Sequence, residues 1–98
     1  MREIMTKLQC YKSILSDLGC VLCRRDIGER VPPELHHIAE GSGQRSDWMM
    51  APLCVNHHRI GGASLHGAGV KRFLSMHGLP TEYHLLELVN KFRAEDGV

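Results

Sequence analysis

The stretch LHHIAEGSGQRSDWMMAPLCVNHHRIGGASLH, residues 35–66, holds five of the seven histidines of this chain. They form two adjacent pairs and a single residue: His36, His37, His57, His58 and His66. A cysteine, Cys54, stands just ahead of the second pair. Imidazole and thiolate are the usual protein ligands of transition metals. This stretch therefore predicts that metal ions organise the domain.

The length of the chain, 98 residues, predicts a single domain over residues 1–98. A domain of this size has a thin margin of stability and often needs a disulfide or a metal as a staple. The N-terminus, MREIMTKLQCYKSIL, is amphipathic rather than continuously apolar, and we expect neither a signal peptide nor a membrane span. We therefore expect a cytoplasmic protein, in which cysteines close in sequence favour metal binding over disulfides.

The formal net charge of +1 is too small to indicate a nucleic-acid partner. Basic residues outnumber acidic ones in the central part of the chain, around the histidines. This placing suits an anionic substrate, but by charge alone an ordinary mixed surface is an equally good interpretation.

Hydrophobic periodicity and turn residues predict the order of the elements. Apolar residues at helical spacing predict a helix over 2–17, ended by Gly19, with Cys10 as a small buried residue on it. Residues 19–33 read as turn-rich. Two strands, over 34–39 and 48–53, predict a hairpin with a long loop, and a short helix follows over 55–60. Residues 61–69 are expected to be flexible, with helices over 70–77 and 80–93.

Four residues have the spacing of a structural zinc site. Cys20 and Cys23 are separated by two residues, and Cys54 and His57 repeat the spacing thirty residues later. Three thiolates and one imidazole are typical of closed tetrahedral zinc sites. The alternative is that these are unrelated thiols, and His58 could replace His57 as the fourth ligand.

Four histidines lie outside this zinc ligand set, namely His36, His37, His58 and His66. Adjacent residues of a helix point about 100° apart, so His57 and His58 can serve two separate sites. In a regular strand His36 and His37 face opposite sides, so one site could use both only at the strand end or on a distorted strand.

The motifs LHHI and PLCVNHH resemble the HNH, or ββα-metal, nucleases. Downstream, the ordered set LGCVLCR, HHI, PLCVNHH, LHG, KRF and HG resembles the Ref (recombination enhancement function) phage nucleases, over roughly residues 18–92. The resemblance implies an α+β fold, a small zinc-stapled ββα-metal (HNH) core with an N-terminal helix and two C-terminal helices. It also implies a phage or prophage protein that acts in DNA recombination, with a recombinase filament as a partner.

The resemblance also implies a role for each remaining histidine. His36 and His58 would bind a divalent catalytic metal, Mg²⁺, Mn²⁺ or another transition metal. His37 would be the general base that activates water, and His66 would be a third ligand or a phosphate contact. An imidazole titrates near neutral pH and so suits the base role. The sequence does not identify the group that would orient His37, and we expect His77 and His84 to take no part in catalysis.

Four basic residues are candidate phosphate contacts: Arg45, Arg59, Lys71 and Arg72. Phosphate contacts give affinity without sequence reading, and no long Arg-, Asn- or Gln-rich helix is present, so we expect weak sequence preference. The sequence thus predicts a metal-dependent DNA endonuclease. One alternative is a non-catalytic zinc-stapled DNA-binding or adaptor module, which gives no reason for the surplus histidines. Another is a second structural site closed by four histidines, which would be an unusual ligand set.

Overall fold

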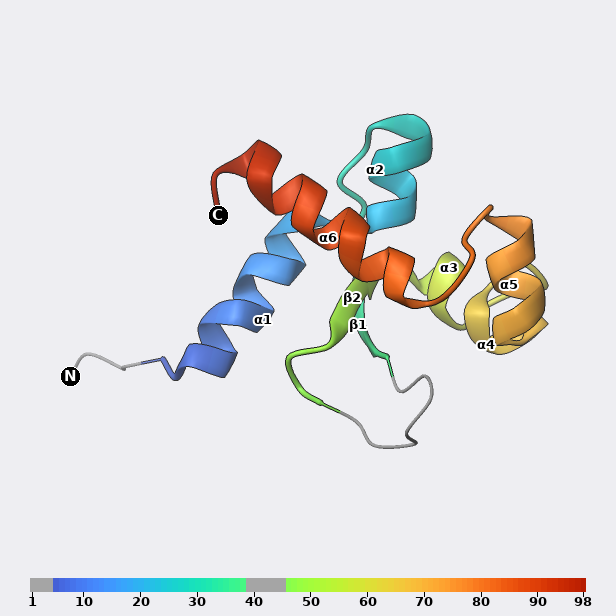
Figure 1. The fold of residues 1–98 in the computed structure, drawn as a ribbon, viewed down its shortest axis with the longest axis horizontal. Helices are drawn as coiled ribbons and strands as arrows, with labels where there is room; N and C mark the ends of the chain where they lie inside the picture. The colour runs from blue at the N-terminus through green and yellow to red at the C-terminus, as the bar shows by residue number, and fades with distance from the viewer. Residues whose placement is uncertain (1–4, 39–45) are drawn as a thin grey trace.

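The computed structural model describes residues 5–38 and 46–98. A two-stranded antiparallel sheet lies near the centre, and helices pack around it (Figure 1). The elements, in chain order, are α1 (Lys7–Leu18), α2 (Val21–Ile27), β1 (Glu34–His37), β2 (Met50–Leu53), α3 (Val55–His58), α4 (Leu65–Ala68), α5 (Val70–Met76) and α6 (Tyr83–Asp96). The architecture is therefore α+β, as the sequence predicts. None of the helices in the described ranges is long and apolar enough to span a membrane.

Local signals set both ends of α1. Thr6 and Gln9 form a capping box, in which each side chain accepts a hydrogen bond from the backbone of the other. The helix ends at Gly19, whose φ of 77° suits glycine, and a Cβ there would lie 2.8 Å from Arg30 Cα. The predicted end of the helix is thus confirmed. The prediction that Cys10 is buried is wrong, because this residue lies on the exposed side of α1.

Two short helices differ from the sequence prediction. α2 occupies much of the segment that reads as turns; Val21 and Leu22 are fully buried, and this burial stabilises a helix too short to form by itself. α4 lies in the segment expected to be flexible, and the Ser64 side chain caps it by accepting from the Gly67 amide at 2.9 Å. Three helices rather than two therefore follow α3.

The hairpin forms as predicted, with strands shorter than expected. Glu34 pairs with Leu53 and His37 with Met50, and every residue of β2 is buried. In β1 only His36 is buried. His36 and His37 are neighbours in β1, so they face opposite sides of the strand, as expected for regular β-structure.

The helix α6 crosses the molecule beside the hairpin and packs against α1, α2 and β2 (Figure 1). It buries Leu85, Val89 and Phe92, each of which contributes roughly 1.5–3 kcal/mol by leaving water. Its C-terminal end is held by Asp96, which accepts hydrogen bonds from Arg24 and Arg30. The core therefore fixes one side of the hairpin, and α3 packs on the hairpin itself.

Candidate functional site

Three sulfurs and one imidazole meet where α2 begins and β2 ends. His57 Nδ1 lies 3.4 Å from Cys20 Sγ, 3.6 Å from Cys23 Sγ and 3.2 Å from Cys54 Sγ. The sulfurs of Cys23 and Cys54 are 3.8 Å apart. Cys20 and Cys54 are the residues that immediately precede α2 and α3, so each pair turns back on one point from the start of a short helix.

These separations fit a tetrahedral zinc ion. Ligands at about 2.3 Å for sulfur and about 2.0 Å for nitrogen give edges of roughly 3.8 Å between sulfurs and roughly 3.5 Å between sulfur and nitrogen. The measured Sγ–Sγ separation of 3.8 Å and the Sγ–Nδ1 separations of 3.2–3.6 Å lie close to these edges. The cluster of Cys20, Cys23, Cys54 and His57 can therefore hold zinc.

Burial disfavours the charged forms of these groups when no cation is bound. It raises the pKa of the Cys20 and Cys23 thiols above the ordinary value. It also lowers the pKa of His57, and nearby His77 adds to this effect. A bound cation reverses this balance, because the thiolate and the neutral imidazole are the metal-binding forms.

Among the residues that the structure describes, a second cluster contains only histidines. Ligand atoms of His36, His58 and His66 lie within 4.8 Å of one another, and the Nε2 atoms of His58 and His66 are 3.2 Å apart. The cluster joins β1, α3 and α4, and it runs from the buried His36 to the exposed His66. Three imidazoles with one exposed member can hold a divalent metal and leave positions open to solvent.

Two carboxylates that the sequence did not single out support this cluster. Glu34 Oε1 lies 3.0 Å from His58 Nδ1, which leaves His58 Nε2 directed at His66. Arg59 donates to both oxygens of Glu34, and its hydrogen bond is the main reason that the pKa of this carboxyl is lowered. Glu82 Oε2 lies 3.5 Å from His36 Nε2, and both side chains are buried. Carboxylates in such positions orient metal-binding imidazoles.

His37 does not belong to the histidine cluster. Its Nε2 lies 3.1 Å from Oδ1 of Asp47, which follows the hairpin loop. A carboxylate only accepts, so the proton of the neutral ring sits on Nε2 and Nδ1 is left as the basic nitrogen. Asp47 is therefore the orienting group that the sequence did not identify. His37 and Asp47 are ten residues apart, on the two sides of the hairpin loop. The predicted hairpin was therefore the signal in the sequence that could have brought them together.

The candidate phosphate contacts differ in their surroundings. Arg59 is exposed and paired with Glu34. Lys71 and Arg72 are exposed in the first turn of α5. Arg45 lies outside the described residues. His77 packs against the ring of His57, and His84 accepts from the Thr81 amide. Neither belongs to a cluster of metal-ligating groups within residues 5–38 and 46–98.

One comparison with known proteins gives a match. The family model described as "Recombination enhancement, RecA-dependent nuclease" matches residues 7–92, which is most of the chain. The matched range includes both clusters, His37 and Asp47. No curated protein and no solved structure matches the chain significantly.

Proposed function

The chain belongs to the recombination enhancement, RecA-dependent nuclease family, and from this premise we propose that it is a metal-dependent DNA endonuclease of the HNH (ββα-metal) type. The observation that carries the proposal is the division of the histidines between two clusters that share α3. A structural zinc module requires only the first cluster. The second cluster is free of cysteine and reaches solvent, as a catalytic metal site does.

In this proposal Cys20, Cys23, Cys54 and His57 hold structural zinc. His36, His58 and His66 hold the catalytic ion. A divalent ion there would neutralise charge on the phosphate and on the leaving oxygen. Imidazole ligands suit transition metals such as zinc or nickel better than magnesium. The Glu34 carboxylate keeps the His58 ring turned so that Nε2 faces the cluster.

His37 is proposed as the general base. Asp47 holds its ring through Nε2, so Nδ1 accepts a proton from the attacking water. His36 and His37 are neighbours at the end of β1, on opposite faces. A phosphodiester lying across this strand end would meet the ion on one side and the base on the other.

The proposed phosphate contacts are Arg45, Arg59, Lys71 and Arg72. Arg59 would exchange or share its contact with Glu34 when DNA binds, since the pair is exposed and weak. Such contacts bring affinity and salt dependence without sequence reading. The family description adds dependence on RecA, so we propose that a recombinase filament presents the DNA in a bacterial host, and that the gene is of phage or prophage origin.

The test is a plasmid-nicking assay with Mg²⁺ or Mn²⁺, with and without RecA filaments, in which zinc content is measured in the same samples. We expect the native chain to cut, and His37→Ala to keep its zinc but lose cleavage by roughly 10²–10⁴-fold. His84→Ala is the matched control and should cut normally. Zinc binding without cleavage of any DNA form, filament-bound DNA included, would instead support the non-catalytic DNA-binding or adaptor module.

A further inference from the structure

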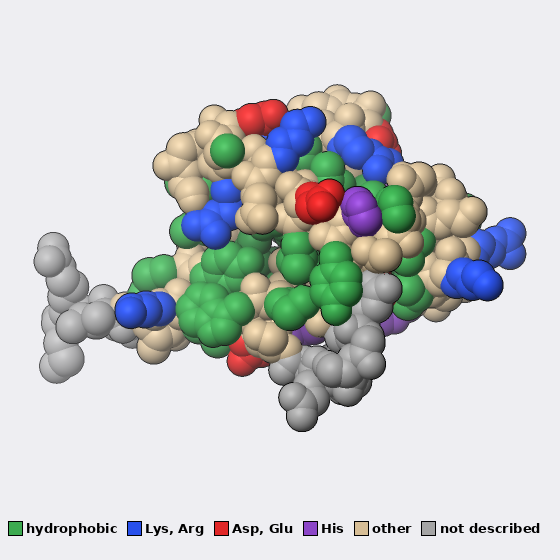
Figure 2. All heavy atoms as spheres, in the orientation of Figure 1, with side chains coloured by type: hydrophobic (Ala, Val, Ile, Leu, Met, Phe, Trp, Pro, Cys, Tyr) green, Lys and Arg blue, Asp and Glu red, His purple; other side chains and the backbone are tan. Residues whose placement is uncertain are grey.

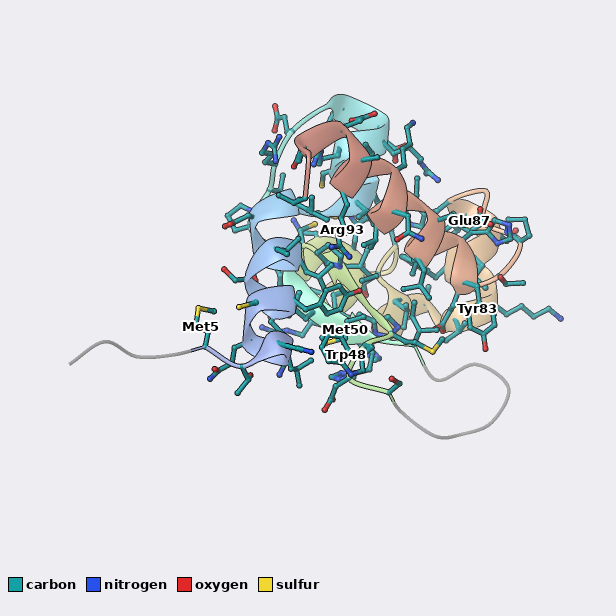
Figure 3. All side chains as sticks on the ribbon, turned by 60° about the vertical axis from the view of Figure 1, so that its left-hand side comes forward. Met5, Trp48, Met50, Tyr83, Glu87 and Arg93 are labelled. Carbon is teal, nitrogen blue, oxygen red and sulfur yellow. The ribbon has the colours of Figure 1, made fainter. Side chains whose placement is uncertain are left out.

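A groove opens between the start of α1, the turn before β2 and the end of α6. Its volume is about 530 Å³, and its walls include Met5, Lys7, Tyr11, Ile14, Trp48 and Arg93. Figure 3 turns this side of the molecule forward, with Met5, Trp48 and Arg93 labelled. This volume lies within the range of about 300–1,000 Å³ typical of small-ligand sites. The groove can therefore accept a flat group the size of a nucleobase.

The groove combines an aromatic platform with positive charge. Trp48 is 52% exposed, and its ring centroid lies 5.4 Å from that of Tyr11. The Arg93 guanidinium carbon lies 5.6 Å from the Tyr11 ring centroid. Lys7 adds a second cation, and none of the described wall residues is acidic. In Figure 2, hydrophobic side chains gather over the hairpin and the lower part of α1, and basic side chains lie beside them.

We propose that this groove binds an unpaired nucleotide of single-stranded DNA, with the base stacked on Trp48 and the adjoining phosphates near Lys7 and Arg93. Aromatic rings in a positively charged groove are the recurrent means of holding single strands, because every base presents a π-face. Duplex DNA buries these faces in its own stack and cannot use the platform unless a base is flipped out.

The inference deepens the proposed nuclease function and rests on it for its consequence. Trp48 directly follows Asp47, whose carboxylate holds His37. A nucleobase stacked on Trp48 would thus bring the DNA backbone close to His37, the proposed general base. The preferred substrate of the site would then be single-stranded DNA, or an unpaired segment within a larger structure. A protein partner is the rival occupant, but a platform edged by cations and free of described acids favours the polyanion.

Trp48 is the only tryptophan of the chain, so its fluorescence reports the groove directly. The native protein would be titrated, without added catalytic metal, with oligothymidylate and with a mixed-sequence strand and its duplex. We expect both single strands to quench the fluorescence and the duplex to quench it weakly. Equal quenching by the duplex, or quenching only by RecA free of DNA, would overturn the proposal.

Variants are compared by the anisotropy of a labelled single strand. Trp48→Leu should weaken binding roughly five- to a hundredfold, Trp48→Phe should recover part of the loss, and Ile27→Ala, which removes a 64% exposed side chain from α2, should have no effect. Thermal unfolding of each variant checks that it is folded. If folded Trp48→Leu binds with unchanged affinity, the proposed role of the groove is wrong, even if the protein cuts DNA. If DNA binds through Trp48 but is never cut, the proposed nuclease function is wrong and the proposed binding groove still stands.

Discussion

His57 and His58 are adjacent residues of α3, yet their rings belong to different clusters. His57 Nδ1 lies 3.2 Å from Cys54 Sγ, whereas His58 Nε2 lies 3.2 Å from His66 Nε2. The turn of about 100° between neighbouring helical residues separates the two rings. One short helix therefore couples the staple to the proposed catalytic metal site, and the two functions should be separable by substitution.

Removing one thiolate of the first cluster should abolish zinc binding there. Cys54→Ser loses a buried ligand of the first cluster, and because zinc binding is linked to folding we expect a loss of at least about 3 kcal/mol. For a chain of this size that corresponds to a fall of about 12–24 °C in Tm. Zinc content and thermal unfolding are the measurements.

Cys10→Ser is the matched control, since this cysteine is exposed on α1 and outside the cluster. It should keep its zinc and its Tm. If both variants lose zinc equally, or if Cys54→Ser retains a full complement of zinc, the assignment of the ligands is wrong.

Removing a histidine of the second cluster should impair DNA cleavage without loss of zinc from the first cluster. We expect His66→Ala to lower the cleavage rate by at least about 10²-fold while binding as much zinc as the native chain, because His66 is exposed and contributes little to packing. Titration with Mn²⁺ should show that the variant binds this ion more weakly. His84→Ala is the control; equal losses in the two variants would point to a general effect on folding instead.

The Asp47 carboxylate should act through His37. Asp47→Asn removes the charge that holds the ring but leaves the side-chain volume, and we expect kcat to fall by about 10–100-fold with little change in KM.

Asp26→Asn is the matched control for Asp47→Asn, since Asp26 is an exposed acid paired with Arg25 on α2. It should leave kcat unchanged. A change confined to KM in Asp47→Asn would assign this residue to DNA binding rather than to orientation of the base.

The sequence was informative where the signal is local. The two-residue spacing in each pair of the first cluster, the glycine after α1 and the two strand-like runs of the hairpin all concern residues a few positions apart, so local patterns predict them. The carboxylates could not be found in this way. Glu34 reaches His58 across 24 residues, and Glu82 comes to His36 from the start of the last helix.

Sequence patterns do not predict the short helices α2 and α4 for a related reason. α2 and α4 contain seven and four residues, too few for periodicity to show. Burial of Val21 and Leu65 against the core stabilises them, and this contact depends on the tertiary fold. The exposed position of Cys10 likewise reflects which face of α1 meets the core, a choice that a short amphipathic pattern leaves open.

The close packing at Gly67 should be essential for placing His66. A Cβ at this position would clash with the Gly61 carbonyl oxygen and lie 2.6 Å from Ser64 Oγ, so Gly67→Ala must displace the turn that carries His66. We expect Gly67→Ala to need roughly tenfold more Mn²⁺ for half-maximal cleavage, while its zinc content stays the same. In Gly62→Ala the added Cβ meets no atom of the described residues within 4 Å, so this variant should behave as the native chain. Normal activity of Gly67→Ala would show that His66 is not required in its present position.

The ion pairs of Asp96 should stabilise the fold above acidic pH. Arg30 and then Arg24 lower the pKa of this carboxyl well below its usual range, by hydrogen bonds that also tie α6 to α2 and to the segment after it. A carboxyl with a lowered folded pKa gives its full stabilisation above the unfolded value of about 3.9 and loses it as the pH falls through the folded value. Asp96→Asn should therefore be less stable than the native chain by the same margin at about pH 7 and pH 5, as measured by urea unfolding, and the margin should narrow below about pH 4. Glu87→Gln alters a 75% exposed acid of the same helix whose contact with His84 Nε2 is long, at 3.9 Å, so it should change the stability far less than Asp96→Asn. A difference between Asp96→Asn and the native chain that grew toward acid would contradict the lowered pKa.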